Sequence, residues 1–390
     1  MYPSQSTARS DITWLLRWAL RLGWRTVSRQ PYTPPVLNFL VTNRCDLRCR
    51  HCFFWERLDS GEAPELDLQE IGKISASMGP MFSLVLSGGE PFLRKDLPQI
   101  AKIFHDQNHA KILLLLTDGQ TPQRITASVE QILELCPESL VIVGVSIDGV
   151  GPVHDEVRQK QGAFEKAIAT FKALQHHALT EPRLAVQTCT VLMRFNQDHI
   201  FTLYSFLRDE LCPERIAVNL IRQDPLDPAE KDVDPQVYVN LIRTIQKDTY
   251  SGLLRNRLGF DRFCFATVAD LHMMDLIYKT LVNGRPTLRC YAGLASGVLF
   301  PDGSVYPCEL REPLGNVRDH DYEFGPLWYP HSRTMFKDPM RKVCFCTHEI
   351  DCFLPSLSLN FHHYPSFIRR WFKVFNGQTR LRKKLLPSST

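Results

Sequence analysis

Residues 36–52 read VLNFLVTNRCDLRCRHC, an apolar run followed by Cys45, Cys49 and Cys52 in CxxxCxxC spacing. The apolar run predicts a strand buried on both faces. A loop that leaves such a strand with three thiols can place each of them at one corner of a single iron–sulfur cluster. One iron then stays open for a substrate or cofactor. Zinc or a reactive thiol is the alternative, although closed zinc sites favour four ligands.

The chain after this motif alternates between two kinds of pattern. We expect strands over 36–42, 83–87, 112–117, 140–146, 184–191 and 216–221, with helices near 67–78, 96–108, 121–135, 162–178 and 196–209. Crossovers of this length connect parallel strands, so the sequence predicts an α/β fold with helices on the sheet. A partial (β/α)6 barrel and an open doubly wound sheet both fit, because periodicity does not separate them.

Composition changes divide the chain into five segments. We expect a basic amphipathic helix over 1–35, the barrel over 36–222, connector helices over 223–285, a small Cys-rich α+β module over 286–355, and a basic aromatic tail over 356–390. A separate module is expected at 286–355 because its short strands and its Gly and Pro content differ from the barrel pattern.

Charge is distributed unevenly along the chain. Residues 1–35 carry a net charge of +4 and residues 352–390 carry +7, which leaves −7 for the middle. This distribution argues against a nucleic-acid partner. Both basic ends are also aromatic, so they are candidates for peripheral contact with an anionic membrane, or for packing on the protein body. No stretch predicts a transmembrane helix or a secretory signal, so we expect a cytoplasmic protein, with peripheral contact at the inner face of the membrane as the refinement.

The CxxxCxxC motif after a first strand resembles the radical S-adenosylmethionine (radical SAM) enzymes, whose fold is a partial (β/α)6 TIM-like barrel. The resemblance implies a [4Fe–4S] cluster on Cys45, Cys49 and Cys52, with S-adenosylmethionine at its open iron. It further implies reductive cleavage of that nucleotide to a 5′-deoxyadenosyl radical, which takes a hydrogen atom from the substrate. A reducing donor such as flavodoxin or ferredoxin is then required.

The same resemblance assigns contacts with S-adenosylmethionine to residues at the ends of later strands. Gly88-Gly89-Glu90 is expected at the amino group, and Ser146 and Asp148 at the hydroxyls. Arg158 is expected at the carboxylate, because its planar fork matches that geometry, or else as an ordinary surface side chain. Gln187 is a weaker candidate, and Asn219 and Arg222 either touch substrate or cap the barrel end.

A second group of cysteines lies near the end of the chain. Cys290-x12-Gly303-x4-Cys308 is similar to the opening of the SPASM/twitch extension of radical SAM enzymes. Cys344, Cys346 and Cys352 follow, so this region has five cysteines where a full SPASM region has seven. We therefore expect one auxiliary [4Fe–4S] cluster, held by Cys290, Cys308, Cys352 and one of Cys344 and Cys346, with structural zinc as the alternative. The isolated Cys136, Cys189, Cys212 and Cys264 are expected in the core.

The resemblance makes this chain an oxidoreductase of the maturase type, which modifies a peptide or protein. One alternative is radical modification of a lipid, a lipid-linked precursor or a small metabolite at the membrane surface. Another is a non-enzymatic zinc or iron–sulfur scaffold or sensor. The pairing of the three-cysteine loop with the Gly88–Glu90 segment favours an enzyme.

Overall fold

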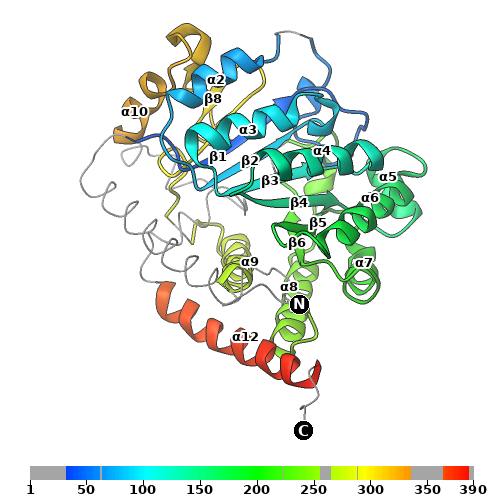
Figure 1. The fold of residues 1–390 in the computed structure, drawn as a ribbon. Helices are drawn as coiled ribbons and strands as arrows, with labels where there is room; N and C mark the ends of the chain where they lie inside the picture. Colours follow the sequence, from blue (N-terminus) through cyan, green and yellow to red (C-terminus); the bar gives the residue numbers. More distant parts are fainter. Residues whose placement is uncertain are drawn as a thin grey trace.

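The computed structural model describes residues 32–61, 64–222, 224–254, 265–287, 289–334 and 363–385. Its centre is a nine-stranded sheet in the order β6-β5-β4-β3-β2-β1-β7-β8-β9 (Figure 1). The strands from β6 to β7 all pair in parallel. The sheet is not closed, which confirms the α/β partial barrel expected from the sequence.

The six expected barrel strands are all present. They are β1 Val36–Thr42, β2 Ser83–Gly88, β3 Ile112–Thr117, β4 Leu140–Ser146, β5 Leu184–Leu192 and β6 Arg215–Leu220. Most of their apolar side chains are buried; β3, with the sequence ILLLLT, buries Leu113, Leu114 and Leu115. Strands that are covered on both faces read as continuous apolar runs, which is why these segments were recognisable.

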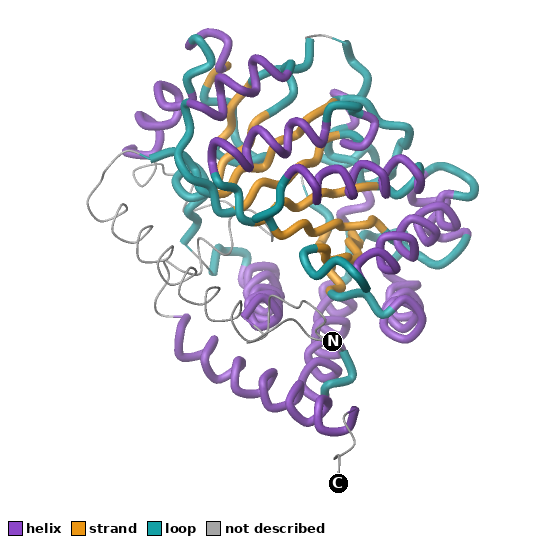
Figure 2. The backbone as a smooth tube through the Cα atoms, viewed as in Figure 1, coloured by secondary structure: helices purple, strands orange, loops and turns teal. Residues whose placement is uncertain are grey.

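Helices cover the outer face of the sheet (Figure 2). They are α2 Leu68–Ala76, α3 Leu97–Asn108, α4 Pro122–Leu135, α5 Pro152–Arg158, α6 Ala163–Ala178 and α7 Ile200–Phe206, which continues as a π-turn over Leu207–Leu211. Short 3-10 turns lie at Trp55–Arg57, Pro91–Leu93, Gln197–His199, Pro228–Lys231 and Val317–His320. The sequence did not predict α5, which falls in the expected loop before the helix at 162–178.

Helix α2 begins with a side-chain cap. Asp67 accepts hydrogen bonds from the backbone N–H groups of Gln69 and Glu70, each at 2.8 Å. The Glu70 carboxylate accepts in return from the Asp67 N–H at 2.9 Å. This reciprocal capping box satisfies donors that the first helical turn leaves unpaired.

The strands of the expected Cys-rich module do not form a detached sheet. Strand β7 (Ser296–Leu299) pairs in parallel with β1, and β8 (Ser304–Tyr306) and β9 (Gly315–Asn316) extend the sheet in antiparallel fashion. The expected module thus shares its strands with the barrel sheet, because β1 offers them a pairing edge, and its bounds at 286–355 stay a prediction. Helix α10 (Phe324–Thr334) follows and buries Trp328 and Phe324.

Three helices pack together beyond the sheet. Helix α12 (Tyr364–Leu385) crosses α8 (Pro235–Ser251) and α9 (Phe265–Asn283) (Figure 1). The predicted basic helix within 1–35 lies outside the described residues, apart from residues 32–35. Among the helices that are described, none combines the length and apolarity that a membrane crossing requires.

Candidate active site

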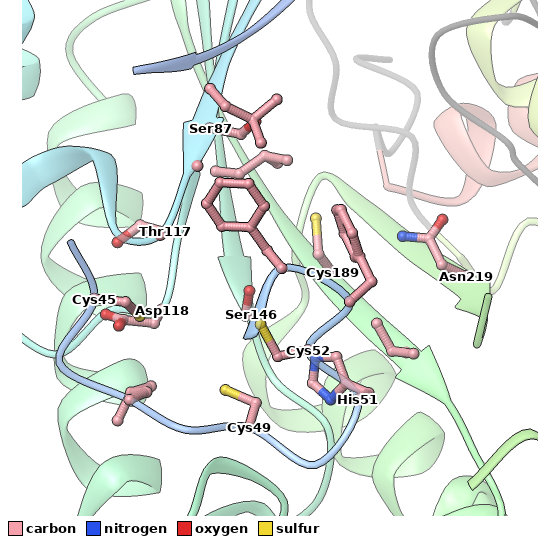
Figure 3. A pocket seen from close by; sticks show the side chains of 18 of the residues that line it. Cys45, Cys49, His51, Cys52, Ser87, Thr117, Asp118, Ser146, Cys189 and Asn219 are labelled. Atoms are coloured by element: carbon pink, nitrogen blue, oxygen red, sulfur yellow. The ribbon is translucent and has the colours of Figure 1, made fainter. Parts of the chain in front are cut away.

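A cavity of about 240 Å³ opens at the carboxyl ends of the parallel strands. Its lining includes Cys45 and Cys52 from the loop after β1, Ser87 from β2, Ser146 from β4 and Asn219 from β6 (Figure 3). Parallel strands present their carboxyl ends at the same edge, so residues far apart in the sequence converge there. This position is where the sequence placed the shared mouth.

The loop after β1 carries three thiols, of which Cys49 is buried and Cys45 and Cys52 are half-buried. All three line the cavity. Burial raises the pKa of each thiol, to about 11 for Cys52. A bound metal deprotonates coordinating thiols, and that interaction offsets the cost of burying the thiolates. Three thiols that share one cavity wall fit a three-cysteine [4Fe–4S] site.

Arg50 connects the cysteine loop to α5 and to the 3-10 turn at 228–231 through two ion pairs. Its guanidinium pairs with Glu156 at 2.6 Å and with the buried Glu230 at 3.3 Å, and lies 4.5 Å from the ring centroid of Phe195. Glu156 belongs to α5 and Glu230 to the 3-10 turn at 228–231. The connector segment thus helps to hold the cysteine loop in place.

Gly88 and Gly89 bring the end of β2 against the same loop. A Cβ at Gly89 would lie 2.2 Å from the carbonyl oxygen of Arg44, and one at Gly88 would lie 2.5 Å from that of Thr42. The Gly89 N–H donates to the Thr42 carbonyl at 2.9 Å. Gly88 also has φ of +131°, which L side chains rarely adopt. Both glycines line the cavity, so their predicted contact with the amino group stays open as a prediction.

Glu90 is buried where β2 and β3 end, and its predicted contact with the amino group stays a prediction. It is 2% exposed, and its carboxylate accepts from the Thr117 hydroxyl at 3.0 Å, the Asp118 N–H at 2.7 Å and the Phe92 N–H at 3.0 Å. Burial and the neighbouring Asp118 carboxylate raise its pKa well above the ordinary value. These contacts tie the ends of β2 and β3 together, and Glu90 is not among the residues that line the cavity.

Arg158 and Asp148 form a buried ion pair beside the cysteines, with 2.5 Å between Nη2 and Oδ2. Asp148 is fully buried, whereas Arg158 and Ser146 line the cavity. The Arg158 Nε atom is buried without a partner among the described residues. That atom leaves a donor for the carboxylate contact predicted for Arg158, whereas the hydroxyl contact predicted for Asp148 has no lining atom to support it.

Gln187 and Cys189 lie next to each other on β5. Gln187 is 1% exposed, accepts from Arg215 at 3.1 Å, and donates to the Cys189 Sγ at 3.6 Å. Cys189 is half-buried and lines the cavity. The expectation that Cys189 belongs to the core was therefore wrong, because alternation along β5 turns its side chain toward the mouth.

A polar wall that the sequence did not fully reveal lines the cavity as well. Its members are Asn38, Arg222 and Glu309. Glu309 accepts from Asn38 at 2.6 Å and from Arg222 at 3.2 Å, and its side chain is 4% exposed. Arg222 was considered from the sequence, but Glu309 was not. The signal was its position directly after Cys308, which only the pairing of β7 with β1 brings to the barrel mouth.

Asp118 lies next to the first cysteine (Figure 3). One ligand atom each from Cys45, Asp46 and Asp118 falls within 4.8 Å of the others. Burial, with the nearby Asp46 charge, raises the pKa of Asp118 to about 6. The Asp118 Oδ2 atom is buried without a partner among the described residues.

The rear cysteines are described only in part. Cys290 and Cys308 are half-buried, and the Cys290 Sγ accepts from the Ala292 N–H at 3.4 Å. Cys344, Cys346 and Cys352 lie outside the described residues. The ligand set of an auxiliary cluster therefore remains a prediction.

Comparisons with known proteins agree with this geometry. Residues 39–207 match the radical SAM superfamily. A cysteine-type anaerobic sulfatase-maturating enzyme of Clostridium novyi (strain NT) is 23% identical over 291 residues, or 69% of this chain and 72% of that enzyme. The antilisterial bacteriocin subtilosin biosynthesis protein AlbA of Bacillus subtilis (strain 168) is 26% identical over 343 residues, or 84% of this chain and 68% of that protein.

A solved structure also shares the fold. The enzyme anSMEcpe, with bound AdoMet and the Cp18Cys peptide, aligns with a TM-score of 0.54 at 16% identity. The alignment covers 87% of this chain and 99% of that one. At this identity the likeness concerns the fold.

Proposed function

We propose that this chain, whose residues 39–207 match the radical SAM superfamily, is an enzyme that oxidises or cross-links a side chain of a peptide or protein substrate. The observation that carries the proposal is the convergence of Cys45, Cys49 and Cys52 on one cavity that Asn38, Arg222 and Glu309 also line. Radical SAM enzymes bind a [4Fe–4S] cluster and S-adenosylmethionine. The three thiols are the side chains that would hold the cluster here.

When bound, the cluster supplies the electron that cleaves S-adenosylmethionine. The chain's own residues position the reactants and exclude water from the mouth. The Gly88–Gly89 backbone, Ser146 and the Arg158 Nε atom are the groups available to the nucleotide. The polar wall of Asn38, Arg222 and Glu309 is available to the substrate.

A peptide substrate is supported by the names of the relatives. One is a sulfatase-maturating enzyme and another a bacteriocin biosynthesis protein, and a third, matched in fold, was solved with a peptide. The polar wall suits a peptide because it offers both donors and acceptors for backbone amides. A lipid-linked or small-metabolite substrate is the second candidate, because apolar side chains such as Phe53 and Phe54 also line the cavity.

Anaerobic reconstitution tests the radical chemistry. With iron, sulfide, a flavodoxin or ferredoxin reducing system and S-adenosylmethionine, the wild type is expected to release 5′-deoxyadenosine and methionine. Cys49→Ala is expected to reduce that release to the protein-free level, because a cluster ligand is lost. Cys212→Ala, which removes a thiol outside the cavity lining, is the matched control. Wild-type protein that binds iron and sulfide but never cleaves the nucleotide would refute the enzyme proposal.

Co-expression tests the substrate class. Short open reading frames beside this gene are expressed with the wild type or with Cys49→Ala. The masses of the encoded peptides are then measured by mass spectrometry. We expect a mass change that only the wild type produces. If no encoded peptide changes mass while a lipid or metabolite extract does, the second candidate replaces the first.

One auxiliary [4Fe–4S] cluster on Cys290 and Cys308, completed by Cys352 and one of Cys344 and Cys346, is part of the proposal. The pairing of β7 and β8 with the barrel supports it, because that pairing carries Cys308 next to the cavity-lining Glu309. The five-segment division of the chain is also retained, with the sheet shared between the barrel and the rear module.

Peripheral membrane contact is proposed for helix α12. Phe367, Trp371 and Val374 face the protein body, whereas Ile368 is 52% and Phe372 is 55% exposed. Arg369 and Lys373 are exposed beside them. An exposed apolar pair flanked by cations suits the interface of an anionic bilayer, where each cation contributes about 1 kcal/mol.

Liposome flotation separates this contact from simple packing. The wild type is expected to float with vesicles that contain phosphatidylserine, and Ile368→Ser with Phe372→Ser is expected to remain at the bottom. The control is Leu179→Ser, which removes an exposed leucine directly after α6. Equal recovery of all three proteins would end the membrane proposal.

A further inference from the structure

The three cysteine sulfurs differ in the donor that each accepts from. The Leu47 backbone donates to Cys45, and the Phe54 backbone donates to Cys52. Cys49 instead accepts from the Arg158 side chain, with 3.5 Å between Nη1 and Sγ. Of the three, Cys49 is therefore the one whose sulfur is hydrogen-bonded by a cation.

The Arg158 guanidinium has no freedom to leave this position. The side chain is 6% exposed, and its second nitrogen pairs with Asp148 at 2.5 Å. Asp148 is in turn fixed between two strands, because its Oδ1 accepts from the Val191 N–H at 2.8 Å. The strand ends of β4 and β5 thus hold the arginine against the sulfur.

This arrangement bears on electron transfer because the Arg158–Asp148 pair beside the sulfur is buried. Reduction adds one negative charge to an iron–sulfur cluster, and hydrogen bonds to its sulfurs together with nearby charge set its reduction potential. A cation that donates to a cluster thiolate stabilises the reduced form more than the oxidised form. The buried Asp148 carboxylate acts in the opposite direction, and both effects are strong at low dielectric.

We propose that Arg158, positioned by Asp148, raises the reduction potential of the cluster on Cys45, Cys49 and Cys52 through the Cys49 sulfur. The inference rests on the proposed function, since it needs that cluster to be present. It adds a role that exists before S-adenosylmethionine arrives. Arg158 is in this sense a positioning residue for electron entry.

The test is a redox titration of the reconstituted full chain without S-adenosylmethionine, followed by electron paramagnetic resonance. The barrel cluster is identified as the signal that Cys49→Ala lacks. Arg158→Gln is expected to lower the ratio of reduced to oxidised cluster about tenfold at a fixed poise, equivalent to about 59 mV for one electron. Asp148→Asn is expected to shift the ratio in the opposite direction, because it removes the opposing charge.

Arg48→Gln is the matched control. It removes the same charge from the cysteine loop itself, but Arg48 is half-exposed and donates to backbone carbonyls and to Asp59. We expect a shift well below that of Arg158→Gln. Arg158→Lys, which keeps the charge, is expected to fall between the wild type and Arg158→Gln.

Opposite shifts for Arg158→Gln and Asp148→Asn support the inference, because general damage to the site would move both in one direction. Shifts of the same sign, or none, with iron content retained overturn it. If Arg158→Gln loses iron, the inference is judged on the other two variants: a higher ratio of reduced to oxidised cluster in Asp148→Asn and a lower one in Arg158→Lys support it, and the opposite signs overturn it. A wild type that cleaves S-adenosylmethionine while potentials stay unchanged refutes this inference alone, whereas a wild type without cleavage refutes the proposed function.

Discussion

The two cysteine regions of this molecule are built in opposite ways. In the front region, Cys45, Cys49 and Cys52 lie within eight residues on one loop and line one cavity. In the rear region, Cys290 and Cys308 lie on either side of a hairpin that extends the barrel sheet. The front site depends on local chain geometry, and the rear region depends on a strand pairing between residues about 260 positions apart in the sequence.

This difference teaches that the two regions respond to different kinds of damage. The front loop is sensitive to any substitution that pushes it away from β2, because Gly88 and Gly89 pack directly against the backbone of Thr42 and Arg44. The rear region is sensitive to loss of its own ligands and of the contacts that hold it to the barrel helices. Three substitutions probe this contrast, in order of expected effect.

Gly89→Ala is expected to have the largest effect. The added Cβ would lie 2.2 Å from the Arg44 carbonyl oxygen, so either β2 or the cysteine loop must move. We expect a loss of about 3 kcal/mol in the free energy of unfolding and failure to assemble the front cluster. Urea denaturation and iron analysis measure the two effects.

Gly72→Ala on α2 is the control, because its Cβ meets nothing within 4 Å. In a helix interior this change is expected to stabilise the fold by about 0.5–1 kcal/mol. If Gly89→Ala assembled the front cluster as well as Gly72→Ala does, the contact argument for the glycine pair would fail.

Cys308→Ala is expected to act on the rear region alone. If the proposed auxiliary [4Fe–4S] cluster is present, iron per chain should fall by roughly half, because one of two clusters is lost. Release of 5′-deoxyadenosine without substrate should continue, because the front thiols are unchanged. Iron analysis and chromatography measure the outcome. Loss of nearly all iron together with loss of 5′-deoxyadenosine release would show that the two regions do not assemble independently.

Glu70→Gln is expected to have the smallest effect, on the junction between the regions. The Glu70 carboxylate accepts from Arg318 at 3.0 Å and from Tyr322 at 2.8 Å, which lowers its pKa to about 2. We expect a loss of about 1–2 kcal/mol at neutral pH. Denaturation midpoints at several pH values measure it.

The sign of the pH dependence follows from the lowered pKa. The carboxylate contributes stability above its unfolded pKa near 4.5, and this contribution is lost as the pH falls toward 2. The difference between wild type and Glu70→Gln should therefore shrink over that interval. Glu134→Gln, at an exposed position on α4, is the control, and an equal loss there would assign the effect to surface charge in general.

Much of the barrel was predictable because its signals are local. The apolar runs predicted all six strands, and the thiol spacing placed Cys45, Cys49 and Cys52 at one mouth. Strand alternation was harder to use, since Cys189 lies on a strand buried on both faces and its orientation depends on register. The contacts of Glu90 with Thr117 and Asp118 join the ends of two strands, and its place beside Gly88 and Gly89 in the sequence did not reveal them.

The remaining features depend on contacts that sequence patterns do not encode. Glu309 reaches the cavity only because β7 pairs with β1. Arg158 contacts Cys49 because α5 ends beside the cysteine loop, and that short helix was not predicted. Long-range pairing and short irregular helices are decided by tertiary packing, which overrides local propensity.

The pairing of β7 with β1 has a consequence for how the chain is made on the ribosome. Strand β1 emerges early, but the partner on its outer side emerges only after about 260 further residues. Until then β1 presents an unpaired row of amide groups, a template for joining with other chains. A nascent or truncated protein that ends before Ser296 should therefore be prone to aggregation, and chaperone binding at this stage would protect it.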